Sequence, residues 1–169
     1  MKYATLSLLV LIFAACAGTQ EPPDEMVPPP PIRQGELTRL YDRMGSDNDA
    51  VGVPASKKLA EGDDRDRRYV ASLWGTRTKS AVGARRYGTA LSGKGLHEEA
   101  FDWFERAFMF IEAGDPLSPW LRYEMANEYY ALGRNDDCIN LLANRMGTTP
   151  LPKELKGKYD DLIAKASRS

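Results

Sequence analysis

The chain has 169 residues, of which 23 are basic and 24 acidic, so its formal net charge is −1. A charge so close to zero provides no bulk field that would recruit nucleic acid, and nucleic-acid binding is therefore disfavoured. The length predicts one modest domain, together with any segments that are removed or unstructured.

The N-terminal segment has the pattern of an export signal. Lys2 is followed by an apolar run over residues 6–13 that is too short to cross a bilayer, and then by two alanines and Cys16. This pattern resembles the lipobox of bacterial lipoproteins, which implies that residues 1–15 are a signal peptide and that Cys16 carries the lipid. Ala17 after the cysteine implies anchoring in the outer membrane of a Gram-negative cell, at its periplasmic face. An ordinary secretory peptide is the alternative, and it also predicts export.

A proline-rich stretch comes next. Six prolines lie between Glu21 and Arg33, with almost no side chain to bury, and such composition favours an extended, polyproline-like chain. Residues 16–34 are therefore predicted to be a disordered tether for a helical domain over residues 35–167. A docking ligand for a proline-recognising partner is the alternative.

Apolar residues at helical spacing then predict the first elements of the domain. Leu37, Leu40, Tyr41 and Met44 indicate a helix that ends at Gly45, and residues 46–53 are predicted to be a loop before a short helix over 54–61.

The next helices begin at polar residues. Asp63 or Asp64 is expected to cap a helix that breaks near residues 75–76, and another helix starts near Lys79. The helices over 36–44 and 65–75 are candidates for a degenerate hairpin, which spacing alone leaves open.

Residues 84–143 contain a helix, a glycine turn and a second helix written twice. Small residues at matching positions would let each pair of helices approach closely, while the large residues fill the space beside them. Laying Gly95 over Gly133 pairs Tyr87 with Met125, Gly88 with Ala126, Leu91 with Tyr129, Ala100 with Cys138, Phe101 with Ile139 and Phe104 with Leu142.

The boundaries of these helices follow from glycine, proline and capping residues. We expect a helix over 97–113 that ends at Gly114, a helix capped by Ser118, and a helix capped by Asn135 that closes at Gly147. A last helix, with Leu155, Tyr159, Leu162, Ile163 and Ala166 in one stripe, is expected to cap the array.

The matched positions resemble the tetratricopeptide repeat, although the spacing is 38 rather than 34 residues and Arg122 and Arg145 depart from the pattern. The resemblance implies an all-α fold: a short array of helical hairpins with a C-terminal capping helix. It also implies a binding scaffold with a concave groove, which the alignment assigns to Val82, Arg85, Thr89, Ser92, Trp120, Tyr123, Asn127 and Tyr130.

Six of these residues are the candidate partner-binding positions: Arg85, Thr89, Trp120, Tyr123, Asn127 and Tyr130. Their mix of aromatic, guanidinium and amide groups is typical of interface hot spots. The family's clamp for a terminal carboxylate is not reproduced, because Thr89 and Glu124 stand where amides are needed, so an internal or helical segment is the expected ligand. Packing of Trp120 and Tyr123 against a neighbouring helix is the alternative.

The histidine, cysteine and arginine residues give little indication of a catalytic or metal-binding site. His97 is the only histidine and Phe101 stands at i+4, so we predict no metal site, no cofactor and no catalytic residues. Cys138 is expected to be a buried thiol. The arginines at 65, 67, 68, 77, 85 and 86 either bind phosphate or lipid A or, as the simpler alternative, form a solvated face.

These patterns together favour a lipid-anchored, non-enzymatic adaptor or assembly factor for a cell-envelope complex of the secretin, pilus, motility or barrel-assembly type. Envelope proteins would bind through the groove, and the membrane would be bound through the lipid on Cys16. The alternatives are a peptidoglycan-acting enzyme or accessory factor and a purely structural lipoprotein.

Overall fold

The computed structural model describes residues 28–144 and 150–168, which form eight α-helices and no strand. The prediction of an all-α fold is thus confirmed for these residues. The predicted signal peptide, Cys16, the first part of the predicted tether and Gly147 lie outside them. The helices are α1 (Pro31–Met44), α2 (Asp49–Ala60), α3 (Asp64–Thr76), α4 (Ala81–Ser92), α5 (His97–Met109), α6 (Ser118–Ala131), α7 (Asn135–Ala143) and α8 (Lys153–Ala166).

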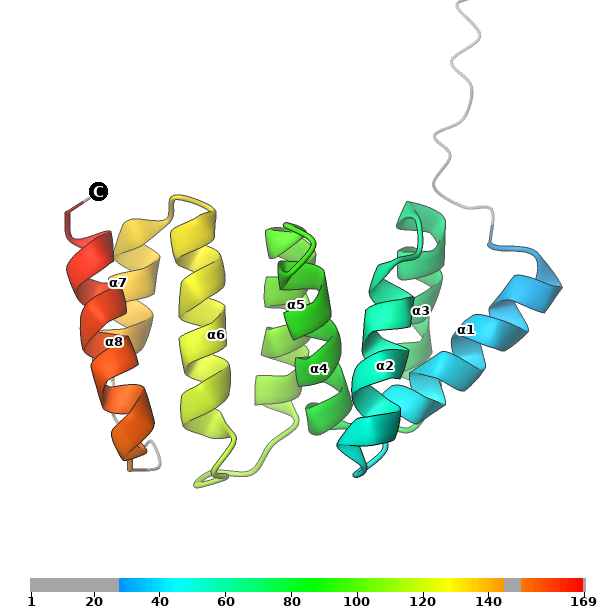
Figure 1. The fold of residues 1–169 in the computed structure, drawn as a ribbon, viewed down its shortest axis with the longest axis horizontal. Helices are drawn as coiled ribbons and strands as arrows, with labels where there is room; N and C mark the ends of the chain where they lie inside the picture. The colour runs from blue at the N-terminus through cyan, green and yellow to red at the C-terminus, as the bar shows by residue number, and fades with distance from the viewer. Residues whose placement is uncertain (1–27, 145–149, 169) are drawn as a thin grey trace, which may run out of the picture.

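The helices stack into an elongated array of two rows (Figure 1). Helices α2, α4, α6 and α8 lie toward the viewer and form the front row, while α3, α5 and α7 lie behind them and form the rear row. Helix α1 crosses the end of the array at an angle and packs on α2 and α3. None of the helices in the described part of the chain is long and apolar enough to cross a membrane.

The hairpins α4–α5 and α6–α7 turn at the two predicted glycines. Gly95 has φ +77° and Gly133 has φ +72°, a left-handed conformation that glycine adopts without steric penalty. The helix starts differ from prediction by one residue, because Ser118 and Asn135 are the first helical residues rather than the caps.

Close packing inside the first hairpin depends on Gly88. A Cβ atom at this position would lie 2.7 Å from Cε1 of Phe104 and 3.1 Å from the carbonyl oxygen of Ala100. The Phe104 ring therefore rests directly against the backbone of α4. Ala126 and Leu142 occupy the equivalent positions of the second hairpin, where both are fully buried.

Helix α5 ends at Met109, so the predicted end at Gly114 is wrong. Phe110, the residue that follows the helix, packs its ring edge-on against Trp74 of α3, with ring centroids 5.9 Å apart. Gly114, with φ +90°, lies in the connection to α6.

The prediction of a loop over residues 46–53 is wrong for most of that stretch, because α2 begins at Asp49. The Asn48 side chain caps this helix by accepting a 2.9 Å hydrogen bond from the Ala50 amide. Helix α2 includes Pro54, and its Gly52 lies against Arg86, where a Cβ atom would be 2.2 Å from Nη1.

The folded domain begins before residue 35, and the predicted tether boundary at residue 34 is too late. Helix α1 starts at Pro31, a position where the missing proline N–H is not needed. Arg33 of α1 binds Asp66 of α3 at 2.5 Å, and Arg65 donates a hydrogen bond to the Pro28 carbonyl. These contacts fix the last prolines of the stretch against the array.

Two further predictions are confirmed, one for the cap of α3 and one for the apolar stripe of α8. Asp63 caps α3 through a 2.8 Å bond from the Asp66 amide. Helix α8 buries Leu155, Tyr159 and Leu162, and the Tyr159 hydroxyl donates to the Pro119 carbonyl of α6 at 2.8 Å.

Candidate functional site

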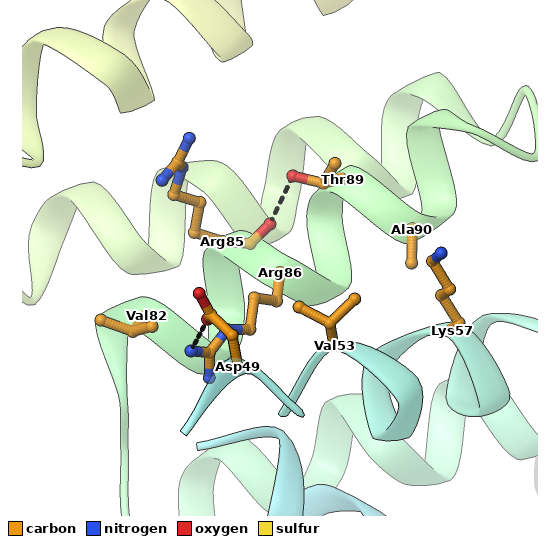
Figure 2. Close-up of a pocket in the computed structure, with 8 residues that line it drawn as sticks. All are labelled: Asp49, Val53, Lys57, Val82, Arg85, Arg86, Thr89 and Ala90. Atoms are coloured by element: carbon orange, nitrogen blue, oxygen red, sulfur yellow. Dashed lines mark hydrogen bonds and ion pairs between the residues drawn. The ribbon is translucent and has the colours of Figure 1, made fainter. Parts of the chain in front are cut away.

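Two pockets open between the helices of the front row and meet at Thr89. We call them the α2/α4 pocket, of about 310 Å³, and the α4/α6 pocket, of about 390 Å³, and together they form the front groove. The α2/α4 pocket is lined by Asp49, Val53, Lys57, Val82, Arg85, Arg86, Thr89 and Ala90 (Figure 2). The α4/α6 pocket is lined by Thr89, Ser92, His97, Phe104, Glu124, Asn127, Glu128, Tyr130 and Ala131.

Arg86 anchors one side of the α2/α4 pocket. Its guanidinium donates to the carbonyl oxygens of Met44 at 3.0 Å and Ser46 at 2.5 Å, and it also binds the Asp49 carboxylate. The Met44 carbonyl belongs to the last turn of α1, where helix carbonyls lack partners within the helix. Arg86 of α4 therefore caps the C-terminal end of α1, and its positive charge is paired with Asp49 of α2.

The opposite side of this pocket is apolar with one cation at its edge. Val53 and Ala90 lie on facing helices, while Val82, a residue that is 40% exposed, lies at the end next to Asp49 and Arg86 (Figure 2). The Lys57 side chain extends beside Ala90 in Figure 2. This combination suits a small aliphatic group next to an acceptor or an anion.

Arg85 turns away from this pocket and binds across to α6. Figure 2 shows its guanidinium pointing away from the Asp49–Arg86 pair. Its Nε donates to Oε2 of Glu124 and its Nη2 to Oε1, both at 2.8 Å. Burial raises the pKa of the Glu124 carboxyl, while the hydrogen bonds from Arg85 act in the opposite direction. This two-point ion pair joins the first hairpin to the second.

Glu128 forms a second polar link between the hairpins. Its side chain is almost fully buried, and its two oxygens lie 2.7 Å from Ser92 Oγ of α4 and 2.7 Å from His97 Nδ1 of α5. In a Ser-His-acid triad the histidine contacts the serine directly. Here the carboxylate lies between the two, so the arrangement lacks the base-to-nucleophile contact.

The structure brings together four of the six predicted partner-binding residues. Arg85 and Thr89 line the α2/α4 pocket, and Thr89, Asn127 and Tyr130 line the α4/α6 pocket. The other two aromatic residues line neither pocket.

Those two aromatics lie toward α8. The Tyr123 ring stacks on the Tyr159 ring with centroids 6.0 Å apart, as the alternative prediction required. Lys158 Nζ is 5.4 Å from the Trp120 ring centroid, and the Arg85 guanidinium is 5.7 Å from the same centroid. Trp120 thus lies between a cation of α8 and a cation of α4.

Several residues of the groove were not among the sequence candidates. Val53 and Lys57 were missed because the groove positions were assigned by the repeat alignment, which did not include α2. Glu128 was missed because its two partners lie 31 and 36 residues away along the chain, a separation without any periodic signal.

The arginine set and the cysteine have structural roles. At least five of the six arginines bind carboxylates or carbonyls of the chain itself, which leaves the phosphate or lipid A alternative without support: Arg65 with Pro28, Arg67 with Asp64 and Glu99, Arg77 with Asp42, Arg85 with Glu124, and Arg86 with Asp49. Cys138 is fully buried, so the prediction of a buried thiol is confirmed, and burial raises the pKa of this thiol.

No protein-family model, curated protein or solved structure matches the chain. Among the residues that the structure describes, no group of three or more His, Cys, Asp or Glu side chains is placed to hold a metal ion.

Proposed function

We propose that this chain is a protein-binding adaptor, built as a short tetratricopeptide-like array with α8 as its cap, whose front groove holds a segment of a partner protein. The observation that carries the proposal is that two pockets, one between α2 and α4 and one between α4 and α6, adjoin along α4 and share Thr89 in their lining. Concave sites with apolar walls and a few directed polar groups are typical of ligand binding.

The polar groups of the groove favour binding over catalysis. Arg85 pairs with Glu124, Arg86 with Asp49 and Glu128 with His97, so most charges are neutralised by partners on another helix. Side chains held in this way lose little freedom when a ligand arrives, which favours affinity. A nucleophile or general base would instead need a reactive group directed at the ligand.

The proposed cellular setting rests on the sequence. The apolar run that ends in two alanines and Cys16 supports a lipid anchor, and we place the adaptor in an envelope complex at the outer membrane. Metabolic labelling with palmitate tests the anchor. Label is expected in the wild type and absent in Cys16→Ala, and equal labelling of both would contradict the anchor.

The groove itself can be tested with a blocked variant and a matched control. Thr89 is exposed at the junction of the pockets, so Thr89→Trp places a ring in the groove without entering the core. Glu105→Trp places the same ring on an exposed position of α5 in the rear row. Peptides selected from a random 12-residue display library against the full chain should bind Thr89→Trp at least tenfold more weakly. They should bind Glu105→Trp as they bind the wild type, and equal binding to both variants would contradict the proposal.

A further inference from the structure

We propose that the α4/α6 pocket selects a cationic side chain, lysine or arginine, of the bound segment. This inference rests on the proposed function and adds the chemistry of the ligand and its direction in the groove. It follows from how the donors and acceptors of the pocket are distributed.

Hydrogen-bond donors that line the pocket are largely committed to the fold. Thr89 Oγ1 donates to the Arg85 carbonyl at 3.0 Å, and Asn127 Nδ2 donates to the Tyr123 carbonyl at 3.0 Å. Ser92 Oγ donates to Glu128 at 2.7 Å. A hydroxyl oxygen keeps acceptor capacity after donating, and the Asn127 side chain also carries a carbonyl oxygen. Thr89 and Asn127 therefore present acceptor oxygens to the pocket, which suits a ligand that brings donors.

The charged residues that line the α4/α6 pocket also favour a cationic ligand. Glu124 and Glu128 both line the pocket, whereas Arg85, which offsets Glu124, does not. The lining therefore holds two carboxylates and no lysine or arginine side chain. A buried charge gains most from a partner of opposite sign, because the local dielectric is low.

Shape and neighbouring surfaces fit a long cationic side chain. Tyr130 lines the pocket and is partly exposed, so its ring can offer aromatic surface to the methylene groups of lysine or arginine. The hydroxyl of Thr89 and the amide oxygen of Asn127 would then accept from the charged end.

The α2/α4 pocket has the opposite preference, and the contrast sets a direction. Arg86 is paired with Asp49 in that pocket, which leaves Lys57 as the cation beside Val53 and Ala90, so the pocket suits an aliphatic or acidic residue. A segment bound in the groove would place its basic residue between α4 and α6 and its aliphatic or acidic residue between α2 and α4. Residues 21–27 of the chain itself contain three acidic residues and no basic one, so they do not fit the α4/α6 pocket.

The test uses the peptides selected against the full chain. Their sequences should share a lysine or arginine, and replacing that arginine by citrulline, which keeps the shape and removes the charge, should weaken binding at least tenfold in fluorescence anisotropy. This measurement uses the wild-type protein and does not depend on whether a variant folds. Asn127→Lys, which adds a cation at the pocket, should weaken the arginine peptides at least tenfold. Asn140→Lys, the same change on an exposed position of α7 in the rear row, should not.

The outcomes separate the two proposals. Peptides that Thr89→Trp weakens but that lack a basic residue, or that tolerate citrulline within twofold, would overturn the cation pocket alone. If no peptide is selected, or the selected peptides are unaffected by Thr89→Trp, both proposals are overturned.

Discussion

The hairpins α4–α5 and α6–α7 differ in how side-chain volume is shared between two matching positions, one on each helix. The first pairs Gly88 with Phe104, and an added Cβ atom at Gly88 would meet the ring at 2.7 Å. The second has Ala126 and Leu142, a methyl group facing a shorter side chain in another buried cluster. The difference teaches that a hairpin of this kind is specified by the combined volume of two facing positions, and that neither position alone sets the packing.

The largest expected effect comes from emptying the first hairpin. Phe104 is almost fully buried, so Phe104→Ala should lower the free energy of unfolding by about 3–5 kcal/mol. Leu142→Ala removes fewer atoms at the matching position and should cost less. Urea unfolding followed by circular dichroism measures both, and a larger loss for Leu142→Ala would contradict the ranking.

Exchanging the residue pairs tests the volume argument directly. Gly88→Ala should destabilise by about 1–3 kcal/mol through overpacking, less the gain of about 0.5–1 kcal/mol from better helix propensity. The double variant Gly88→Ala with Phe104→Leu copies the second hairpin and should be more stable than the sum of the single losses predicts. Additive losses in this double-mutant cycle would show that the two positions do not share one space.

The polar link between the hairpins should give a pH-dependent loss. Arg85→Met removes the hydrogen bonds that lower the pKa of the buried Glu124 carboxyl, so that pKa rises further above its ordinary value of 4.5. Below 4.5 the carboxyl is protonated in both the folded and unfolded chain, and the penalty is absent. Between pH 4.5 and the raised pKa, the folded chain holds a proton that the unfolded chain has released, so stability falls as pH rises and the loss is complete above the raised pKa.

The expected loss for Arg85→Met at pH 7 is about 1.5–3 kcal/mol, the range for hydrogen bonds to charged groups. It should be smaller at pH 4, as urea midpoints at the two pH values will show. Adding Glu124→Gln should remove the difference between the two pH values. An equal loss at both, with Glu124 intact, would contradict the account.

The smallest effects should distinguish two buried tyrosines. Tyr159 donates to the Pro119 carbonyl, so Tyr159→Phe should cost about 0.5–1.5 kcal/mol. The Tyr87 hydroxyl of the first hairpin has no hydrogen-bond partner among the described residues, and burial raises its pKa. Tyr87→Phe should therefore be neutral or stabilising, and a loss as large as that for Tyr159→Phe would indicate a partner for the Tyr87 hydroxyl.

The sequence alone predicts the second half of the array better than the first. Gly95 and Gly133 turn the chain at matching points, and local residue chemistry is enough to locate such turns. The first residues of α2 were missed because Gly52 suggests a loop, whereas Gly52 accommodates the Arg86 guanidinium from 34 residues further along the chain. Short-range propensity does not report such a contact.

The sequence predicted only part of the groove, because the remaining contacts join residues that are far apart along the chain. Thr89 and Asn127 were placed by their position in a repeat, which carries information about the face of a helix. Tyr123 is of a residue type common at interface hot spots, but its ring stacks on Tyr159 of α8. The link from Glu128 to Ser92 and His97 depends on how three helices meet. Contacts between distant helices are set by tertiary packing, which no spacing within the sequence records.

The central claim is that the front groove holds a segment of a partner. Chemical-shift changes in the amide NMR spectrum of the full chain, on titration with a peptide selected against it, test this claim most directly. The account predicts changes at Val53, Thr89 and Asn127, on α2, α4 and α6, and none at Asp102, Glu105 or Asn140 on the rear helices. Changes confined to the rear helices, with the three front positions unmoved, would contradict it.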